Sequence, residues 1–460
     1  MTLGMEETRL EHWRLLIVRR DGEEILLKAD GARLELPQVS IPANQRIAAN
    51  INRAAERELG LHLICLYEIR TDNQALPGYP FYHAAACLRP QETVPAGAYW
   101  TLVRPLTAQS FSKEADFAAM RAMQTGLDSP LTDEPFRKPN WLREVTAWVN
   151  RALQPYPVRL TGSFEQFNAS PAFSLIRFDT TGAPVWFKAI GAPNTREFAL
   201  TLALARSCPA YLPKILDAKA EWNAWLAENA SGSSLSDTLG TAHWENAAES
   251  LARLQTLTLS AAGELPAKGA RDLRLRSLLP RVAPFFASLR ERAQDACLPE
   301  RERPACLDWR ELCTAVEDAL GCLGELHIPN AAGHMDLNPQ NIFCSGQRCV
   351  FLDWAEGFVG CPFFSFEYLL QHFRRAVRPN HPLEMSFREA YFSAWREFLE
   401  CRVLERACEL SRLLALFAYA STLWNALEER DSLVLPQRVY FLRLARKMSR
   451  MTRKARTVCA

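Results

Sequence analysis

The sequence predicts an α+β protein, with a small α/β region followed by a longer region of two lobes, one rich in strands and one mainly helical. Three observations support this prediction. Strand-like runs dominate residues 158–190, whereas helical spacing of apolar residues dominates from His243 onward. A polar stretch at residues 128–140, which contains three prolines, has the composition of a linker. The length of 460 residues is also too great for one ordinary domain and suits two or three.

The region before the linker, residues 1–127, alternates strand and helix patterns. Gly60 follows the first expected helix, at a position where glycine commonly ends a helix in the left-handed conformation. We therefore expect one small α/β domain here. Its expected strands are residues 12–18, 24–28, 63–69 and 81–88, and its expected helices are residues 47–59 and 114–123.

The region after the linker, residues 141–460, begins with apolar residues at helical spacing. Because helices then follow the strands to the end of the chain, we expect a small β-rich lobe at about residues 141–232 and a large helical lobe at about residues 233–460. The expected strands are residues 158–167, 172–178, 185–190 and 222–227, with a helix at residues 195–206.

The most informative segment runs from Gly333 to Asn341 and reads Gly-His-Met-Asp-Leu-Asn-Pro-Gln-Asn. It is followed by Asp353 within the run Phe-Leu-Asp-Trp. Two short apolar runs around a Ser-Gly turn lie between Asn341 and Asp353, and they predict a β-hairpin that brings these two residues together. Pro339 argues against a helix through the loop.

An aspartate, an asparagine five residues later and a second aspartate after a hairpin are typical of a phosphoryl-transfer site. One carboxylate, here Asp336, would face the acceptor hydroxyl. Mg²⁺ prefers hard oxygen ligands and keeps several waters, so Asn341 and Asp353 would be enough to hold it on the nucleotide phosphates. Asp336 and Asn341 alone could simply cap turns. His334, Asp353 and the hairpin in register favour a functional site.

This segment resembles the catalytic and metal-binding loops of the aminoglycoside phosphotransferase and choline kinase group, which are small-molecule kinases with a protein-kinase-like fold. The family pattern is a His, any residue, an Asp, four residues, an Asn, and later an Asp followed by an aromatic residue. The resemblance covers about residues 140–460 and implies a bilobal protein-kinase-like fold. It implies that Asp336 is the catalytic base, that Asn341 and Asp353 bind Mg²⁺, and that ATP is the phosphate donor. His334 would support the loop rather than react.

A kinase site also needs a strand lysine on the nucleotide phosphates and a helix glutamate that holds this lysine. Lys188 in an apolar strand and Glu197, nine residues later, fit these roles in the order that the family shows. Residues 227–232 resemble the family's hinge, which makes Ala227 and Asn229 candidates for contact with the adenine. The alternatives are that Lys188 protects an edge strand, that Glu197 completes a capping box, and that residues 227–232 are a polar linker.

One segment departs from the family pattern, which commonly reads Gly-Asp-Pro with a further Asp three residues later. Cys361 and Ser365 replace those two acids. The second acid usually braces the catalytic loop, so we expect Ser365 to brace it more weakly or another group, such as Glu367, to substitute. This departure bears on catalytic efficiency rather than on the type of chemistry.

The N-terminal region weakly resembles a degenerate Nudix domain, through the segment Arg53–Gly60. Ala54 and Arg57 replace two expected glutamates, and Glu58 remains well placed. Because one of three metal ligands should not assemble a metal site, we expect no hydrolase activity. The alternative is an ordinary amphipathic helix.

The chain is 48% apolar and 23% charged, with a net charge of +2. Such a small net charge does not indicate binding to nucleic acids or membranes. The first twenty residues lack the apolar core of a signal peptide. Thirteen cysteines without a CxxC pair suggest reduced, mostly buried thiols and a cytoplasmic protein. Residues 438–456 carry eight Lys or Arg and no acids, which indicates either a solvated helix face or a site for an anionic partner.

Together these features predict an ATP- and Mg²⁺-dependent kinase that phosphorylates the hydroxyl of a small molecule. The alternative is a catalytically weak nucleotide-binding sensor that combines a pseudo-Nudix module with a kinase-like one. The acceptor would be selected by the helical region between about residues 369 and 429. Glu389, Glu428 and Glu429 in this region could attract a cationic acceptor or simply be solvated.

Overall fold

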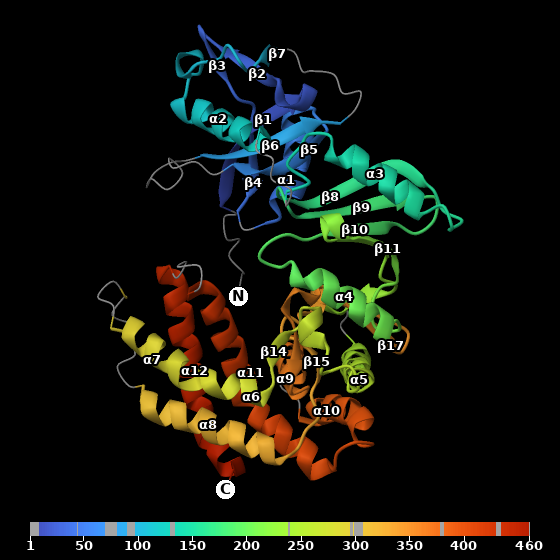
Figure 1. Cartoon of the computed structure of the whole chain (residues 1–460), viewed down its shortest axis with the longest axis vertical. Coiled ribbons are helices and arrows are strands. Elements are labelled where there is room, and N and C mark those ends of the chain that lie inside the picture. Colours follow the sequence, from blue (N-terminus) through green and yellow to red (C-terminus); the bar gives the residue numbers. More distant parts are fainter. Residues whose placement is uncertain are drawn as a thin grey trace, which may run out of the picture. The chain divides into compact units, whose positions relative to one another are not determined.

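The computed structural model describes residues 9–459 except residues 44, 70–80, 90–96, 129–133, 238–239, 295–297, 299–306, 378–380 and 429–433. It consists of two compact units. The first comprises Met1–Thr195 and Ile215–Asn229, and the second comprises Arg196–Lys214 and Ala230–Ala460. The first unit is rich in strands and the second is mainly helical (Figure 1), so the predicted α+β class is confirmed.

The first unit contains a seven-stranded sheet with the order β3-β2-β1-β6-β5, in which β4 also pairs with β1 and β7 with β2. Alternate residues of β1 face opposite sides: Leu15 packs in the core under helix α1, and Leu16 packs in the core that contains helix α2. β1 and β6 run parallel, whereas the other described strand pairs of this sheet are antiparallel. The elements are β1 (Leu10–Arg19), β2 (Glu24–Asp30), β3 (Arg33–Glu35), β4 (Gln38–Pro42), α1 (Ile47–Leu59), β5 (Leu63–Ile69), β6 (Phe81–Leu88), β7 (Ala98–Leu102) and α2 (Glu114–Asp128).

The first unit also contains a five-stranded antiparallel sheet with the order β11-β12-β10-β9-β8. The expected boundary at residues 128–140 falls inside this unit. Residues 129–133 lie outside the described residues, whereas Phe136 is buried against Trp141 and Phe187. The elements are α3 (Trp141–Ala152), β8 (Leu160–Ala169), β9 (Ser174–Thr180), β10 (Val185–Ala189), β11 (Ile215–Lys219) and β12 (Ala224–Glu228).

A buried glutamine joins the two sheets. Gln166 on β8 donates to the carbonyl oxygen of Cys65 on β5 at 2.8 Å and accepts from the Cys65 backbone N–H at 3.0 Å. Asn52 on α1 donates to the same Gln166 oxygen at 3.1 Å. The side chain of Gln166 therefore bonds to β5 much as the backbone of a neighbouring strand would.

The second unit is built around one large apolar core, with α11 beside α12 and α5 beside α10 (Figure 1). Two three-stranded sheets, β13-β16-β17 and β14-β18-β15, are set into it. In the part of the chain that the structure describes, no helix is long and apolar enough to cross a membrane. The helices are α4 (Arg196–Ser207), α5 (Thr241–Leu257), α6 (Leu275–Leu278), α7 (Val282–Arg292), α8 (Trp309–Glu325), α9 (Phe363–Ala376), α10 (His381–Trp395), α11 (Cys401–Glu428) and α12 (Leu435–Cys459). The strands are β13 (Ser233–Ser234), β14 (Arg271–Leu273), β15 (Ala331–His334), β16 (Ile342–Ser345), β17 (Arg348–Phe351) and β18 (Gly357–Gly360).

Two disulfides correct the expectation of reduced thiols. Cys322–Cys459 ties α8 to the end of α12, and Cys344–Cys349 ties β16 to β17. The seven other described cysteines are not disulfide-bonded, and five of them are buried. The Cys322–Cys459 pair depends on the fold, which brings together residues 137 apart in the sequence, whereas Cys344 and Cys349 face each other across the predicted hairpin and were overlooked.

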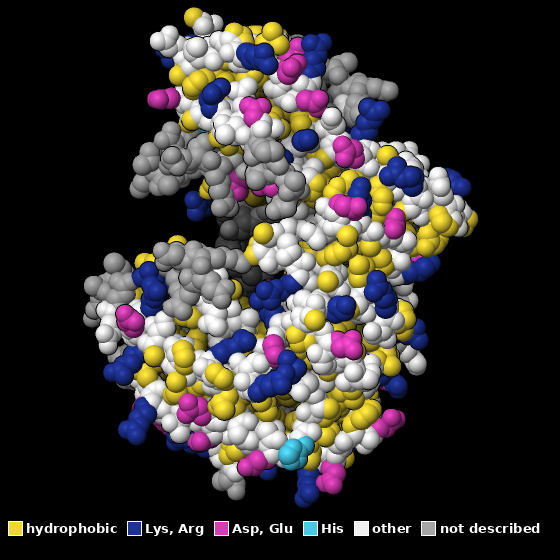
Figure 2. All heavy atoms as spheres, in the orientation of Figure 1, with side chains coloured by type: hydrophobic (Ala, Val, Ile, Leu, Met, Phe, Trp, Pro, Cys, Tyr) yellow, Lys and Arg dark blue, Asp and Glu magenta, His cyan; other side chains and the backbone are white. Residues whose placement is uncertain are grey.

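Charged side chains of both signs are interspersed over the visible face of each unit (Figure 2). This distribution matches the near-neutral net charge of +2.

Candidate active site

The segment with the phosphoryl-transfer pattern forms a loop and a hairpin, as predicted. Strand β15 ends at His334, a short 3₁₀ turn covers Pro339–Asn341, and β16 and β17 then pair with Ile342 opposite Phe351. The backbone N–H of Leu352 donates to the carbonyl oxygen of Asn341 at 2.8 Å. The hairpin therefore returns the chain to Asn341 one residue before Asp353.

Asp336 and Asn341 are in direct contact. The side-chain amide of Asn341 donates to the backbone oxygen of Asp336 at 3.0 Å and to its carboxylate Oδ2 at 3.4 Å. Because the Asn341 nitrogen faces Asp336, the amide oxygen is the atom left for a metal ion. Asp353 is exposed, so its carboxylate is accessible to a metal. An amide oxygen and a carboxylate beside each other fit the hard oxygen donors that Mg²⁺ prefers.

Asp353 adopts a left-handed backbone conformation, with φ 62° and ψ 64°. Such a conformation is uncommon outside glycine, although aspartate tolerates it better than most residues. It lies directly before the buried Trp354, whose ring is 4.9 Å from that of His334. Unusual backbone geometry of this kind often occurs at functional sites.

His334 holds the loop from inside. Its side chain is fully buried, its Nδ1 accepts from the Asp336 backbone N–H at 3.0 Å, and its Nε2 donates to the Leu352 carbonyl oxygen at 3.0 Å. Burial lowers the pKa of His334, which keeps the ring neutral. These two bonds connect Asp336 to the strand that leads into Asp353. They agree with the expectation that His334 supports the loop.

Ser365 braces the same loop. Its side-chain oxygen, fully buried on α9, accepts from the backbone N–H of His334 at 2.7 Å. The suggestion that Glu367 substitutes as the brace is wrong, because its carboxylate accepts from Gln371 at 2.5 Å and faces Arg374 at 3.8 Å. Glu367 lies two residues beyond Ser365 on the helix, and this spacing turns the two side chains in different directions.

Two glycines allow close packing behind the loop. A Cβ on Gly333 would lie 2.1 Å from the Phe358 ring, and a Cβ on Gly360 would lie 2.6 Å from the Leu273 carbonyl oxygen. Both glycines are in the β14-β18-β15 sheet, so this sheet can form only with no side chain at these positions.

The residues expected on the nucleotide side are divided between the units. Lys188 lies on β10 and Ala227 on β12 in the first unit, and Asn229 follows β12. The ammonium of Lys188 is 5.5 Å from the centre of the Trp225 ring, and the side-chain oxygen of Asn229 accepts from the Trp186 indole at 2.8 Å. Glu197 is buried in the first turn of α4, in the second unit.

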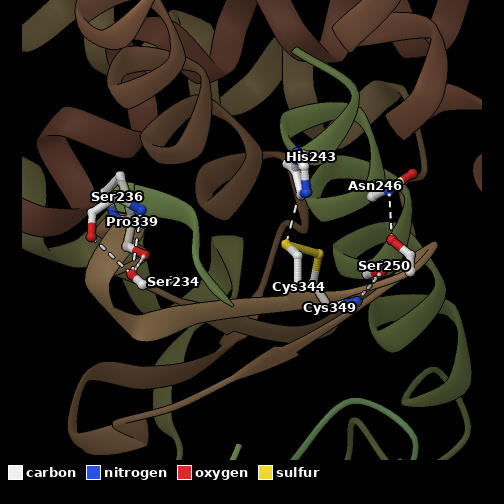
Figure 3. The surroundings of a disulfide bond; sticks show 9 residues. Ser234, Ser236, His243, Asn246, Ser250, Pro339, Cys344 and Cys349 are labelled. Carbon is white, nitrogen blue, oxygen red and sulfur yellow. Dashed lines mark hydrogen bonds between the residues drawn. A yellow bond between two sulfur atoms is a disulfide. The ribbon is translucent and has the colours of Figure 1, made fainter. Parts of the chain in front are cut away.

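The hairpin is anchored by side chains of α5 and β13 (Figure 3). Ser250 on α5 accepts from the Cys349 backbone N–H at 3.0 Å, and Ser234 on β13 donates to the Pro339 carbonyl oxygen at 3.1 Å. The Cys344–Cys349 disulfide joins the two strands between these anchors. The candidate metal ligands at the two ends of the hairpin are thereby held in a fixed register.

Asp336 opens onto a pocket of about 300 Å³. The hydroxyl of Tyr368 on α9 donates to Asp336 Oδ1 at 3.4 Å. Burial, and to a smaller degree the charge of Asp336, raises the pKa of Tyr368 to about 12, so the phenol keeps its proton. Sequence reasoning missed Tyr368, which has only the spacing of an ordinary helix residue. The other lining residues are Arg271, Met335, Glu356, Tyr419, Thr422, Leu423 and Ala426.

In the N-terminal region, the side chain of Glu58 is engaged with the protein itself. Its Oε2 accepts from the Ser40 backbone N–H at 3.2 Å, and its Oε1 pairs with Arg57. Arg53, in the same helix, pairs with Glu165 on β8 at 2.6 Å. The resemblance to a Nudix domain stays a prediction.

Comparison with known proteins supports the phosphotransferase assignment. Residues 188–410 match the model of the phosphotransferase enzyme family. The match includes Lys188 and Glu197 and extends through Asp336, Asn341 and Asp353. No curated protein matches the chain.

Several solved structures are similar to the chain at low identity. A choline/ethanolamine kinase family protein from Mesorhizobium loti is 14% identical with a TM-score of 0.43, covering 68% of this chain and 99% of that one. An ethanolamine kinase from Plasmodium vivax is 13% identical with a TM-score of 0.47, covering 72% and 93%. A macrolide 2′-phosphotransferase from Brachybacterium faecium is 14% identical with a TM-score of 0.42, covering 63% and 96%.

Proposed function

We propose that this protein is an ATP- and Mg²⁺-dependent phosphotransferase that moves the γ-phosphate of ATP to the hydroxyl of a small molecule. The observation that carries the proposal is the contact of Asn341 with Asp336, at the end of a hairpin that returns at Asp353. Phosphoryl transfer depends mainly on positioning and charge neutralisation. Asp336 would supply the positioning of the acceptor, and Asn341 and Asp353 would hold the cation that neutralises charge.

Each residue has a distinct role in this proposal. Asp336 orients the acceptor hydroxyl and takes its proton, while Asn341 and Asp353 hold Mg²⁺. The bound ion would neutralise charge on the transferred phosphoryl group. His334 positions Asp336 through the bond between its ring and the Asp336 backbone.

The residues assigned to ATP binding are those that the family resemblance implies. Lys188 would bind the α- and β-phosphates and Glu197 would hold the lysine in place, as the family resemblance implies. The backbone around Ala227 and Asn229 would meet the adenine. The small-molecule acceptor would enter the pocket in front of Asp336.

A pair of variants tests these roles. Asp336→Asn should abolish phosphate transfer, with kcat at least about 100-fold lower, and should leave Mg-ATP binding nearly intact because it removes only the proton acceptor. Asp353→Ala should instead weaken Mg-ATP binding. An ATP-consumption assay and a nucleotide titration of both variants measure these effects. Normal transfer by Asp336→Asn would show that the mechanism is wrong.

A second candidate function is a catalytically weak nucleotide-binding sensor. It is motivated by Cys361, which occupies a position where the family commonly has an acid and is a buried thiol whose pKa burial raises to about 12. This position therefore carries no charge at neutral pH. A thermal-shift screen with Mg-ATP, ADP-ribose and candidate alcohols separates the two functions. Turnover of any acceptor excludes the sensor, whereas binding without ATP consumption supports it.

A further inference from the structure

A second pocket adjoins the one that contains Asp336. Its volume is about 330 Å³, and the two pockets share Met335, Tyr368 and Tyr419. Helices α9, α11 and α12 form its walls, all within the second unit. Tyr368 therefore borders both spaces while its hydroxyl donates to Asp336.

Three basic side chains line this second pocket: Arg375 on α9, Arg412 on α11 and Lys447 on α12. Arg412 is 3.5 Å from Glu409. Among the described residues, neither Arg375 nor Lys447 has a carboxylate within salt-bridge distance. Burial, and then the charge of Arg375, lowers the pKa of the half-buried Lys447. The half-buried Lys447 and the exposed Arg375 repel each other, and an anion bound by both would relieve this repulsion.

The one acid that lines this pocket offsets these charges only in part, because its attraction raises the pKa of Lys447 less than burial and Arg375 lower it. Glu367 is 3% exposed, its Oε1 faces Gln371 and Arg374, and its Oε2 has no hydrogen-bond partner. Burial raises the pKa of Glu367, which favours its neutral form. For His372, burial and then the charge of Arg375 lower the pKa, against a smaller opposing effect of Asp336, and the neutral ring is therefore favoured. Three basic side chains against one acid leave the pocket with a net positive charge.

The acids that might have attracted a cationic acceptor are not part of the pocket. Glu389 is exposed and pairs with Arg396. The side chains of Glu428 and Glu429 lie outside the described residues. Each described charged residue of the pocket except Glu367 is therefore basic.

We propose that the acceptor carries an anionic group, a phosphate ester or a carboxylate, which Arg375 and Lys447 bind while the acceptor hydroxyl faces Asp336. This inference rests on the proposed kinase function and specifies its substrate class. Tyr368, Tyr419 and Tyr440 line the space around the cations and would hold the carbon skeleton through their rings.

Pairs of compounds that differ only in the anionic group test the proposal. Binding is measured by calorimetry on the full chain, with Mg²⁺ and a non-hydrolysable ATP analogue filling the nucleotide side. Ribose 5-phosphate and glycerol 3-phosphate should bind at least about 10-fold more tightly than ribose and glycerol, since a charge-assisted hydrogen bond is worth about tenfold or more. Glycerate in place of glycerol 3-phosphate distinguishes a carboxylate from a phosphate preference. Equal or tighter binding of the neutral members, or of choline and ethanolamine, would overturn it.

Two variants locate the anion. Lys447→Met and Arg375→Met remove one charge each and keep an apolar stem, and each should weaken glycerol 3-phosphate binding about 10- to 100-fold while glycerol is unaffected. Arg450→Met is the matched control, because Arg450 lies on the same helix, is exposed and does not line the pocket. An equal loss for both compounds, or the same loss in the control, would contradict the anion site.

Mg-ATP binding tests the proposed kinase function, and the choice of acceptor tests the anion site, so the two can fail independently. Mg-ATP affinity should be the same in wild type, Lys447→Met and Arg375→Met. Absence of Mg-ATP binding in wild type would overturn the kinase function itself. Mg-ATP binding together with transfer to neutral or cationic acceptors alone would keep the kinase and overturn the anionic acceptor.

Discussion

At the scale of single residues, buried polar side chains fix the shape of the candidate catalytic loop. His334 bonds on one side to the Asp336 backbone and on the other to Leu352, and Ser365 accepts from the His334 backbone. None of these bonds reaches the reacting groups directly. Because the His334 and Ser365 side chains are fully buried, loss of a partner would leave a polar group in an apolar core.

Ser365 should matter for both stability and catalysis. Replacement by alanine leaves the buried N–H of His334 without an acceptor, so Ser365→Ala should lower the free energy of unfolding by about 1–3 kcal/mol. It should also lower kcat, because the loop loses its brace. Chemical denaturation and an ATP-consumption assay measure the two effects.

Ser421→Ala is the control for Ser365. Ser421 is equally buried in the second unit, but its hydroxyl donates only to the carbonyl oxygen of Ala418 in its own helix, at 3.3 Å. Loss of this hydroxyl should change the free energy of unfolding little, since the Ala418 carbonyl is in the hydrogen-bonded backbone of a helix. Similar stability for Ser365→Ala and wild type would show that the brace is unimportant.

At the scale of elements, one glutamate connects two helices of the second unit. Glu384 on α10 accepts from Arg374 on α9 at 2.6 and 2.9 Å, and from Arg388 on its own helix at 3.0 and 3.1 Å. Arg374 precedes Arg375, the cation of the proposed anion site. The position of α9 at this pocket therefore depends on a pairing made outside it.

This pairing should make the stability of the protein sensitive to acid. The hydrogen bonds from Arg374 lower the pKa of Glu384 from 4.5 to about 2. A carboxyl whose pKa is lower in the folded state stabilises the fold above its unfolded pKa. This contribution is complete above about pH 4.5 and disappears as the pH falls toward 2.

Glu384→Gln should therefore be less stable than wild type at pH 7, by about 1 kcal/mol, and the difference should shrink between pH 4.5 and pH 2. Urea denaturation across this pH range measures it. Glu389→Gln, which removes an exposed acid paired with Arg396 just after the same helix ends, should show little difference at any pH. A Glu384→Gln difference that is constant with pH would contradict the assigned pairing.

At the scale of the whole molecule, the two sheets of the first unit share one apolar core. Leu16 and Ile25 of the seven-stranded sheet and Ile176 and Phe187 of the five-stranded sheet belong to the same buried cluster. Gln166 adds polar bonds between the sheets. We therefore expect the two sheets to unfold together.

Gln166→Ala tests this connection. It leaves the backbone N–H and carbonyl of Cys65 without their side-chain partner, so the free energy of unfolding of the first unit should fall by about 1–3 kcal/mol. Circular dichroism of wild type and variant during denaturation measures the change. Gln154→Ala removes an exposed glutamine of the same unit and should be neutral. A Gln166→Ala variant as stable as wild type would argue that the sheets are held by apolar contact alone.

The sequence predicted those features that local patterns determine. Helix α1 covers the expected residues because its apolar positions recur with helical period and Gly60 ends it in the left-handed conformation, with φ 67°. The approach of Asp336, Asn341 and Asp353 followed from short spacings and a hairpin. Contacts between distant residues were not predictable. The Gln166–Cys65 bonds span 101 residues, and the second pocket combines side chains from three helices.

The Cys322–Cys459 disulfide closes a loop across 137 residues and secures the last turn of α12 to α8. The same α12 supplies Lys447, Leu444 and Met451 to one wall of the second pocket. The disulfide lies away from Asp336 and stabilises the position of α12, and therefore of this wall of the pocket. We expect loss of Cys322–Cys459 alone, with Cys344–Cys349 intact, to raise KM for the acceptor and to leave the hairpin between Asn341 and Asp353 unchanged.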